Sequence, residues 1–335
     1  MFLEGIALEN FIQRKRLVAP FAGFPSINLG KHSLKQCQEN AKYHSQVIRR
    51  LSDTLKPDIL FPMMDLSLEV GALNFQVDYQ DNEPAFVPNT KFHLDELQTL
   101  NDVDIFKSQR LNNYIETIHK LNRCSGDSKM LGAYITGPFT LAALILDFET
   151  TKAAINQRRE DFHKLLEFTM HNQLKIAKEL VNSGANVICI VEPTAVFLGE
   201  DKYFEFSGSY VKKMAKCIHS LLADCILHIC GDTMHMVREM SRTDVDVLSV
   251  DSPDEGVDML TIASTIQEGI IYQGNINPTG TILTGTPENV YQETRDLMVL
   301  MQNVPNFILG TGCDLPKDVP IENLQAFMKA GREPF

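Results

Sequence analysis

Eight short apolar runs recur along the 335-residue chain, each followed by a Gly, Pro or Asp turn and then by a helical pattern. The runs are β-branched and lack a regular polar alternation, which is typical of strands covered on both faces of a parallel sheet. Eight such strands alternating with helices predict an α/β fold, a (β/α)8 TIM barrel, with a flat doubly wound sheet as the alternative. The runs cover residues 16–23, 58–62, 129–138, 186–193, 224–231, 244–251, 269–278 and 306–316.

The segments between the runs carry helical signals. A helix is expected to begin at Ser33, a plausible cap, and to continue to Leu55. Residues 70–90 predict a small β excursion after the second strand. No linker or low-complexity tract interrupts the chain, so we expect a single domain over residues 1–335. Further helices are predicted over 151–182, 202–222, 287–301 and 321–329.

Charge and composition exclude several classes of partner. The chain carries 31 Lys and Arg against 43 Asp and Glu, a net charge of −12, which argues against nucleic acid and anionic membranes. No apolar stretch approaches the roughly 20 residues of a membrane span. The first residues place apolar before basic side chains, the reverse of a signal peptide. Seven thinly spread Cys suit a reducing compartment, so we expect a cytoplasmic protein.

The most informative residues lie where the predicted strands end, because a barrel carries its chemistry on the loops at that face. His228 and Cys230 are two positions apart on a strand, so both side chains point to the same side. Imidazole and thiolate are zinc ligands, although a lone His-x-Cys is more often core packing. Cys313 lies at the end of another predicted strand, just after two glycines, and supplies a third donor. Three donors with one open position are the arrangement of a catalytic zinc.

Five further residues at strand ends are candidates for the same site. Glu192 is the candidate for a labile fourth zinc ligand. Asp65 could act as a general acid or base or could cap the next segment, and the cap is favoured. Asp251 could orient a substrate or a metal ligand, or could cap a turn. Gly137 and Asn275 are candidate cofactor-binding positions, although an Asx turn is favoured for Asn275.

Six segments spread along the chain carry a family resemblance: PDILFPMMDLSLEVGA, ITGPFTLA, EPTAVFLGEDKYFEF, VLSVDSP, YQGNINP and FILGTGCDLP. Through them the chain resembles the uroporphyrinogen decarboxylase superfamily along nearly its whole length. Within that superfamily it is similar to the zinc-dependent corrinoid methyltransferases, such as methylcobamide:coenzyme M methyltransferases. Their His-x-Cys and distant Cys fall on His228, Cys230 and Cys313. The resemblance implies Zn²⁺ as cofactor, a corrinoid such as methylcobalamin as co-substrate, and methyl transfer to a thiol.

The chain departs from the decarboxylases of that superfamily at the first strand. Those enzymes carry arginines there that bind substrate propionates, whereas this chain has no Arg between Arg16 and Arg49. A polyanionic substrate without that positive clamp would be held poorly. At the eighth strand Cys313 stands where decarboxylases have a His, but Asp65 matches their Asp. Decarboxylation is therefore disfavoured and stays an alternative.

Two other functions stay open. Relatives of this type pass a methyl group from an ether or amine donor to a corrinoid protein, using the same three ligands. A non-catalytic corrinoid-binding module is the remaining alternative. Aromatic residues at the barrel mouth, for which Phe139 and Phe197 are candidates, would favour an aromatic ether, and a cationic group there would favour a sulfonated thiol. Expected partners are a small methyl donor or acceptor and a separate corrinoid protein, and a homodimer is a further candidate assembly.

Overall fold

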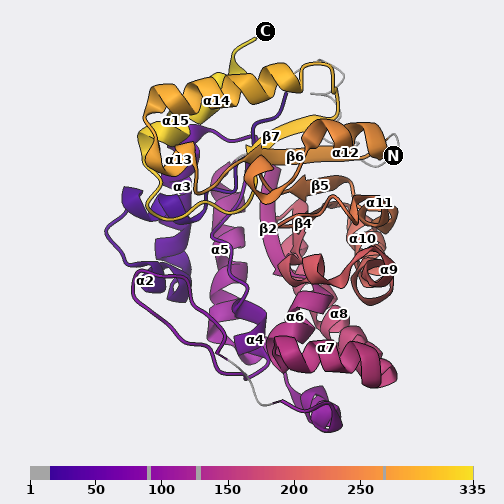
Figure 1. Cartoon of the computed structure of the whole chain (residues 1–335). Coiled ribbons are helices and arrows are strands. Elements are labelled where there is room, and N and C mark those ends of the chain that lie inside the picture. The colour runs from indigo at the N-terminus through magenta and orange to yellow at the C-terminus, as the bar shows by residue number, and fades with distance from the viewer. Residues whose placement is uncertain (1–15, 89–91, 126–129, 267–268, 335) are drawn as a thin grey trace.

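Seven parallel strands form one sheet, and their order in space follows their order in the chain. The computed structural model describes residues 16–88, 92–125, 130–266 and 269–334, with the strands at the centre and helices around them (Figure 1). Sequential parallel strands joined by helices confirm the predicted α/β barrel-like fold and not a flat doubly wound sheet. The strands are β1 (Ile59–Leu60), β2 (Met130–Thr136), β3 (Val187–Val191), β4 (Asp224–Ile229), β5 (Val247–Val250), β6 (Ile271–Ile276) and β7 (Phe307–Thr311).

Residues 16–23, predicted as the first strand, lie between the two edge strands of this sheet but do not form a regular strand. Val18 forms an isolated parallel bridge with Leu309 of β7, and the Ala19 amide donates to the Leu309 carbonyl at 2.8 Å. On the other side, the Asp58 amide donates to the Val18 carbonyl at 3.0 Å, just before β1. The ladder is short because Pro20 has no N–H to extend it. The predicted strand over 16–23 is therefore corrected to a single bridge that joins β7 to β1.

The strands are buried on both faces, which explains their lack of polar alternation. In β2, Tyr134 belongs to a cluster that fills the barrel interior, whereas Ala133 and Ile135 belong to the larger core outside. In β4, Ile226 points into the interior, so His228 two residues later points to the same side. The interior cluster contains Leu17, Ala19, Phe21, Ile59, Phe61, Met64, Met130, Tyr134, Val187, Cys189, Val191, Ile226, Val247, Ile271 and Ile308.

Helices surround the sheet, and several predicted helices are divided. The helix predicted over 33–55 is broken at Asn40, whose side chain accepts hydrogen bonds from the next helix's amides and so starts a new helix. The helix predicted over 151–182 is broken at Arg158. The α-helices are α2 (Leu34–Glu39), α3 (Ala41–Leu55), α4 (Leu68–Ala72), α5 (Gln109–Ser125), α6 (Pro138–Leu146), α7 (Phe148–Gln157), α8 (Arg159–Asn182), α9 (Glu200–Tyr203), α10 (Ser209–Ser220), α11 (Val237–Met240), α12 (Met259–Thr265), α13 (Thr281–Thr284), α14 (Pro287–Leu300) and α15 (Ile321–Arg332).

The predicted β excursion over 70–90 is much smaller than expected. Its first residues belong to α4, and within the described residues its β structure is one antiparallel bridge between Asp78 and Phe86. Residues 89 and 90 lie outside the described part. None of the helices in the described ranges is both long and apolar enough to cross a bilayer.

Candidate metal centre

One imidazole and two thiols meet at the carboxyl ends of two strands. The ligand atoms of His228, Cys230 and Cys313 all lie within 4.8 Å of one another. His228 belongs to β4, Cys230 follows β4 directly, and Cys313 follows β7. The imidazole is fully buried, whereas both cysteines are half-buried and therefore open toward solvent. The structure thus brings together the three residues that the spacing singles out, while their binding of a metal stays a prediction.

The orientation of His228 fits a metal ligand. Its Nδ1 lies 3.0 Å from the Ser249 hydroxyl on the neighbouring strand, and the Phe21 ring meets the imidazole edge-on at 5.3 Å. Its Nε2 is buried and has no hydrogen-bond partner among the described residues. Buried polar atoms nearly always have a partner, and metal-bound histidines commonly use the second ring nitrogen for a hydrogen bond. Nε2 is therefore the atom available to a metal.

The two thiols act on each other. The pKa of Cys230 is lowered to about 5, first by a hydrogen bond from Cys313 and then by the neighbouring His228, against the effect of burial. The same contact with Cys230, followed by burial, raises the pKa of Cys313 well above its ordinary value. One sulfur is thus held as a thiolate by the proton of the other. A bound dication would favour deprotonation of both.

Asp251 supports the turn that carries Cys230. Its Oδ2 accepts a hydrogen bond from the Gly231 amide at 2.8 Å, and its Oδ1 accepts one from the Ser252 amide at 2.7 Å. Gly231 has a φ of 86°, a conformation that glycine adopts without strain. Asp251 was considered from the sequence either as a group that orients a substrate or a metal ligand, or as the cap of a turn. Its contacts hold the turn that carries Cys230, the candidate metal ligand.

Asn275 holds the same region from β6. Its Nδ2 donates to the Asp251 carbonyl at 2.9 Å, and the side chain is buried. The Asx turn favoured for Asn275 is wrong, because Asn275 lies within a strand. The turn belongs to Asn277, whose Oδ1 accepts from the Thr279 amide at 2.9 Å. Binding of a cofactor by Asn275 stays a prediction.

Glu192 lies at the end of β3 against the start of α6. Its oxygens accept hydrogen bonds from the Phe139 amide at 2.9 Å and the Thr140 amide at 2.7 Å. A Cβ on Gly137 would lie 2.0 Å from Glu192 Cγ, so glycine is needed there for the carboxylate to approach. Burial raises the pKa of Glu192 to about 7. Glu192 is not a member of the three-residue cluster, and its role as a fourth ligand stays a prediction.

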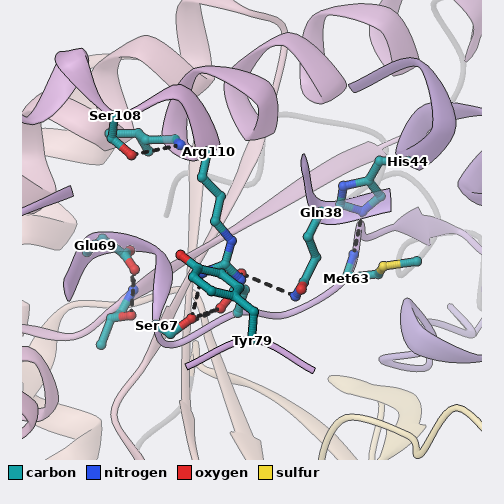
Figure 2. Close-up of polar contacts among 11 residues, drawn as sticks. Gln38, His44, Met63, Ser67, Glu69, Tyr79, Ser108 and Arg110 are labelled. Carbon is teal, nitrogen blue, oxygen red and sulfur yellow. Dashed lines mark hydrogen bonds and ion pairs between the residues drawn. The ribbon is translucent and has the colours of Figure 1, made fainter. Parts of the chain in front are cut away.

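Asp65 lies in a polar network on another side of the barrel mouth, in which both of its carboxylate oxygens have partners. Its Oδ1 accepts from the Ser67 amide at 3.1 Å and so closes the turn before α4, whereas Ser67, the N-cap residue of α4 itself, makes no side-chain capping bond, so the favoured capping role is limited to that turn. Its Oδ2 forms an ion pair with Arg110 and accepts from Gln38 at 3.2 Å. Figure 2 shows Arg110 extended toward Ser67 with the Tyr79 ring against its guanidinium, 4.8 Å away. Arg110 was not expected, because no local sequence signal links α5 to Asp65.

Asp314 and Tyr134 are further polar residues beside the cluster; Asp314 is one of the residues expected at a strand end, whereas Tyr134 was not expected. Asp314 follows Cys313, and both of its carboxylate oxygens are buried without a hydrogen-bond partner among the described residues. Burial raises the pKa of Asp314 well above its ordinary value, and the neighbouring Leu315 amide, which donates to the Phe21 carbonyl at 2.9 Å, offsets this only partly. The Tyr134 hydroxyl, at the end of β2, is also buried without a partner. Burial, and then the charge of Asp314, raise the pKa of Tyr134 well above its ordinary value.

The aromatic residues considered for the mouth differ in exposure. Phe139 is buried in the core, whereas Phe197 is 70% exposed and meets Phe148 edge-on at 5.2 Å. Both line a cavity of about 270 Å³ beside α7, together with Lys152 and Lys202. None of the three cluster residues lines this cavity.

Comparisons with known proteins agree with the fold and show the family of the chain. A family model described as uroporphyrinogen decarboxylase (URO-D) matches residues 27–334. A methylcobamide:CoM methyltransferase, MtbA, from Methanosarcina mazei is 27% identical over 252 residues, which are 75% of this chain and 71% of the relative. A uroporphyrinogen decarboxylase from Prochlorococcus marinus is 24% identical over 309 residues, 90% of this chain and 87% of the relative. The solved structure of a methyltransferase from Methanosarcina mazei superposes with a TM-score of 0.84 at 17% identity, covering 97% of both chains.

Proposed function

Because the chain belongs to the uroporphyrinogen decarboxylase (URO-D) family, we propose that it is an enzyme of that family's corrinoid methyltransferase type. The proposed reaction moves a methyl group between a corrinoid and a small thiol, CoM being the thiol in the name of the MtbA relatives. One observation carries the proposal: the imidazole of His228 and the thiols of Cys230 and Cys313 converge at the carboxyl ends of the strands.

The three converging side chains fit Zn²⁺, which accepts both nitrogen and sulfur donors. His228 Nε2, Cys230 Sγ and Cys313 Sγ would hold it, with Ser249 fixing the second imidazole nitrogen. When bound, Zn²⁺ would act as a Lewis acid that lowers the pKa of a substrate thiol. Three protein donors leave one position for that thiol or for Glu192, which would first exchange its hydrogen bonds with α6.

The atoms and electrons of the proposed transfer balance without another reactant. The thiol proton leaves to solvent, and the sulfur lone pair forms the new S–CH3 bond. The pair of the broken Co–CH3 bond stays with cobalt, which is reduced to Co(I). The methyl donor is free methylcobalamin or a separate methylated corrinoid protein. Asp251 and Asn275 keep the Cys230 turn in place during this step.

Decarboxylation is the second candidate, because decarboxylases match 90% of the chain at about the same identity as the methyltransferases. Its key residue would be Asp65. That carboxylate is paired with Arg110, Ser67 and Gln38, which leaves it poorly placed to receive a substrate. Methyl transfer from an ether or amine to a corrinoid protein uses the same three ligands, and the direction of transfer is open to measurement. We further propose a single cytoplasmic domain.

Elemental analysis and methyl transfer test this function together. We expect one zinc per chain in the purified protein and none in the triple variant His228→Ala, Cys230→Ala, Cys313→Ala. Methylcobalamin mixed with a thiol should show the spectral change of demethylated cobalt only in the zinc-containing protein. Cys217→Ala, at an exposed free cysteine, is the matched control. Methyl transfer by the metal-free triple variant would overturn the proposal.

A further inference from the structure

Unpartnered polar atoms gather beside the metal cluster. Four buried side-chain atoms in this region have no hydrogen-bond partner among the described residues: Tyr134 Oη, His228 Nε2 and both oxygens of Asp314. Tyr134 and His228 both contact the Phe21 ring, whose centroid lies 5.6 Å from that of Tyr134 and 5.3 Å from that of His228. His228 Nε2 is accounted for by the proposed zinc. The carboxylate and the phenol remain without a role.

A buried carboxylate without a partner costs free energy, and a cation that binds to it recovers that cost. The same carboxylate and hydroxyl can both accept hydrogen bonds from an ammonium group. Cys230 and Cys313 are half-buried residues, so a small molecule can reach the cluster from solvent, whereas the Asp314 oxygens and the Tyr134 hydroxyl beside it are buried. The unpartnered atoms therefore match the chemistry of a cationic ligand.

An anionic ligand is disfavoured for the complementary reason. The side chains whose charges act on Cys313 are Cys230, Asp314 and Asp251, all of which are acidic. The arginine on another side of the mouth, Arg110, is already paired with Asp65. A sulfonate or carboxylate near Asp314 would meet like charge, because the two Cys thiolates already offset the charge of the proposed zinc.

We propose that Asp314 and Tyr134 form a subsite for a positively charged group of the methyl acceptor, so that the preferred thiol is an aminothiol and not a sulfonated thiol. This inference rests on the proposed function, because it assigns the substrate class of the same site. The acceptor's sulfur would face the metal cluster, and its ammonium group would donate hydrogen bonds to the Asp314 carboxylate and the Tyr134 hydroxyl.

Three thiols of equal chain length test the subsite by equilibrium binding. They are 2-aminoethanethiol, 2-mercaptoethanol and 2-mercaptoethanesulfonate, measured by titration calorimetry with the zinc-loaded, full-length protein. We expect the aminothiol to bind about ten- to a hundredfold more tightly than the sulfonate, as for a hydrogen bond to a charged group. Asp314→Asn should abolish this preference, and Tyr134→Phe should reduce it. Asp318→Asn, at a 71% exposed side chain of the same loop, should leave it unchanged.

Several results would overturn the proposal that Asp314 and Tyr134 form this subsite. Equal or tighter binding of the sulfonate would do so, as would a preference that survives Asp314→Asn. Loss of zinc from Asp314→Asn would instead make Asp314 a metal ligand and would also overturn it. Methyl transfer from methylcobalamin is measured separately with each thiol. Its absence with all three thiols contradicts the proposed function, whereas the binding preference still decides the subsite.

Discussion

Two carboxylates near the barrel mouth, Asp65 and Asp314, have opposite environments. Asp65 is paired with a buried guanidinium, a hydroxyl and amides, so the charge of this carboxylate is compensated within the protein. Asp314 has no partner for either oxygen in the described part of the chain, and it adjoins the cluster of His228, Cys230 and Cys313. Compensated groups hold a fold together, whereas uncompensated buried groups mark a site prepared for a ligand.

The largest expected effect is on stability and comes from the ion pair between Asp65 and Arg110. Arg110→Met leaves the Asp65 carboxylate buried without its cation, which we expect to destabilise the protein by about 3–5 kcal/mol. The double variant with Asp65→Asn should recover much of this loss. Urea unfolding followed by circular dichroism measures both. Arg159→Met is the control, because the ion pair of Arg159 with Glu205 is exposed and should contribute no more than about 1 kcal/mol. A loss for Arg110→Met as small as for the control would show that the network is not structural.

The next effect is on the metal cluster. Cys230→Ala removes one of the three donors, and we expect zinc affinity to fall at least about a hundredfold, or about 3 kcal/mol. Competition with a chromophoric chelator measures this affinity. Cys189→Ala offers a buried control outside the cluster. Unchanged affinity in Cys230→Ala would exclude Cys230 as a ligand.

Glu69, a buried carboxyl group near Asp65, is expected to make the stability of the protein depend on pH. Burial raises its pKa from 4.5 to about 7, although it accepts hydrogen bonds from the Thr136 amide and hydroxyl, each at 2.9 Å. A carboxyl group whose pKa is higher in the folded state binds protons more tightly when folded. Stability should therefore fall as pH rises from about 4.5 to about 7, by about 3 kcal/mol, and then level off. Glu69→Gln should flatten this part of the unfolding free energy against pH. The same slope in the variant would assign it to other groups, such as Glu192.

Much of the metal cluster follows from the sequence, because its geometry is local or topological. His228 and Cys230 are two residues apart at the end of β4, and Cys313 joins them because parallel strands end at the same face. The partners of Asp65 do not follow, since Arg110 reaches it only through the packing of α5. The predicted first strand does not form, because Pro20 has no N–H and stops the ladder.

The smallest expected effect is the change in stability caused by Asp314→Asn, which we compare with the same substitution at Asp65. Asp65→Asn removes the charge that Arg110 pairs with and should destabilise the protein. Asp314→Asn removes a buried charge without a partner, so it should stabilise the zinc-free protein by about 1–2 kcal/mol. Both are measured by urea unfolding in the presence of a chelator. If Asp314→Asn is destabilising too, the carboxylate has a structural partner and the contrast between the two sides fails. If it is stabilising and also loses the aminothiol preference, the free energy that Asp314 costs the fold is the free energy that a cationic ligand recovers.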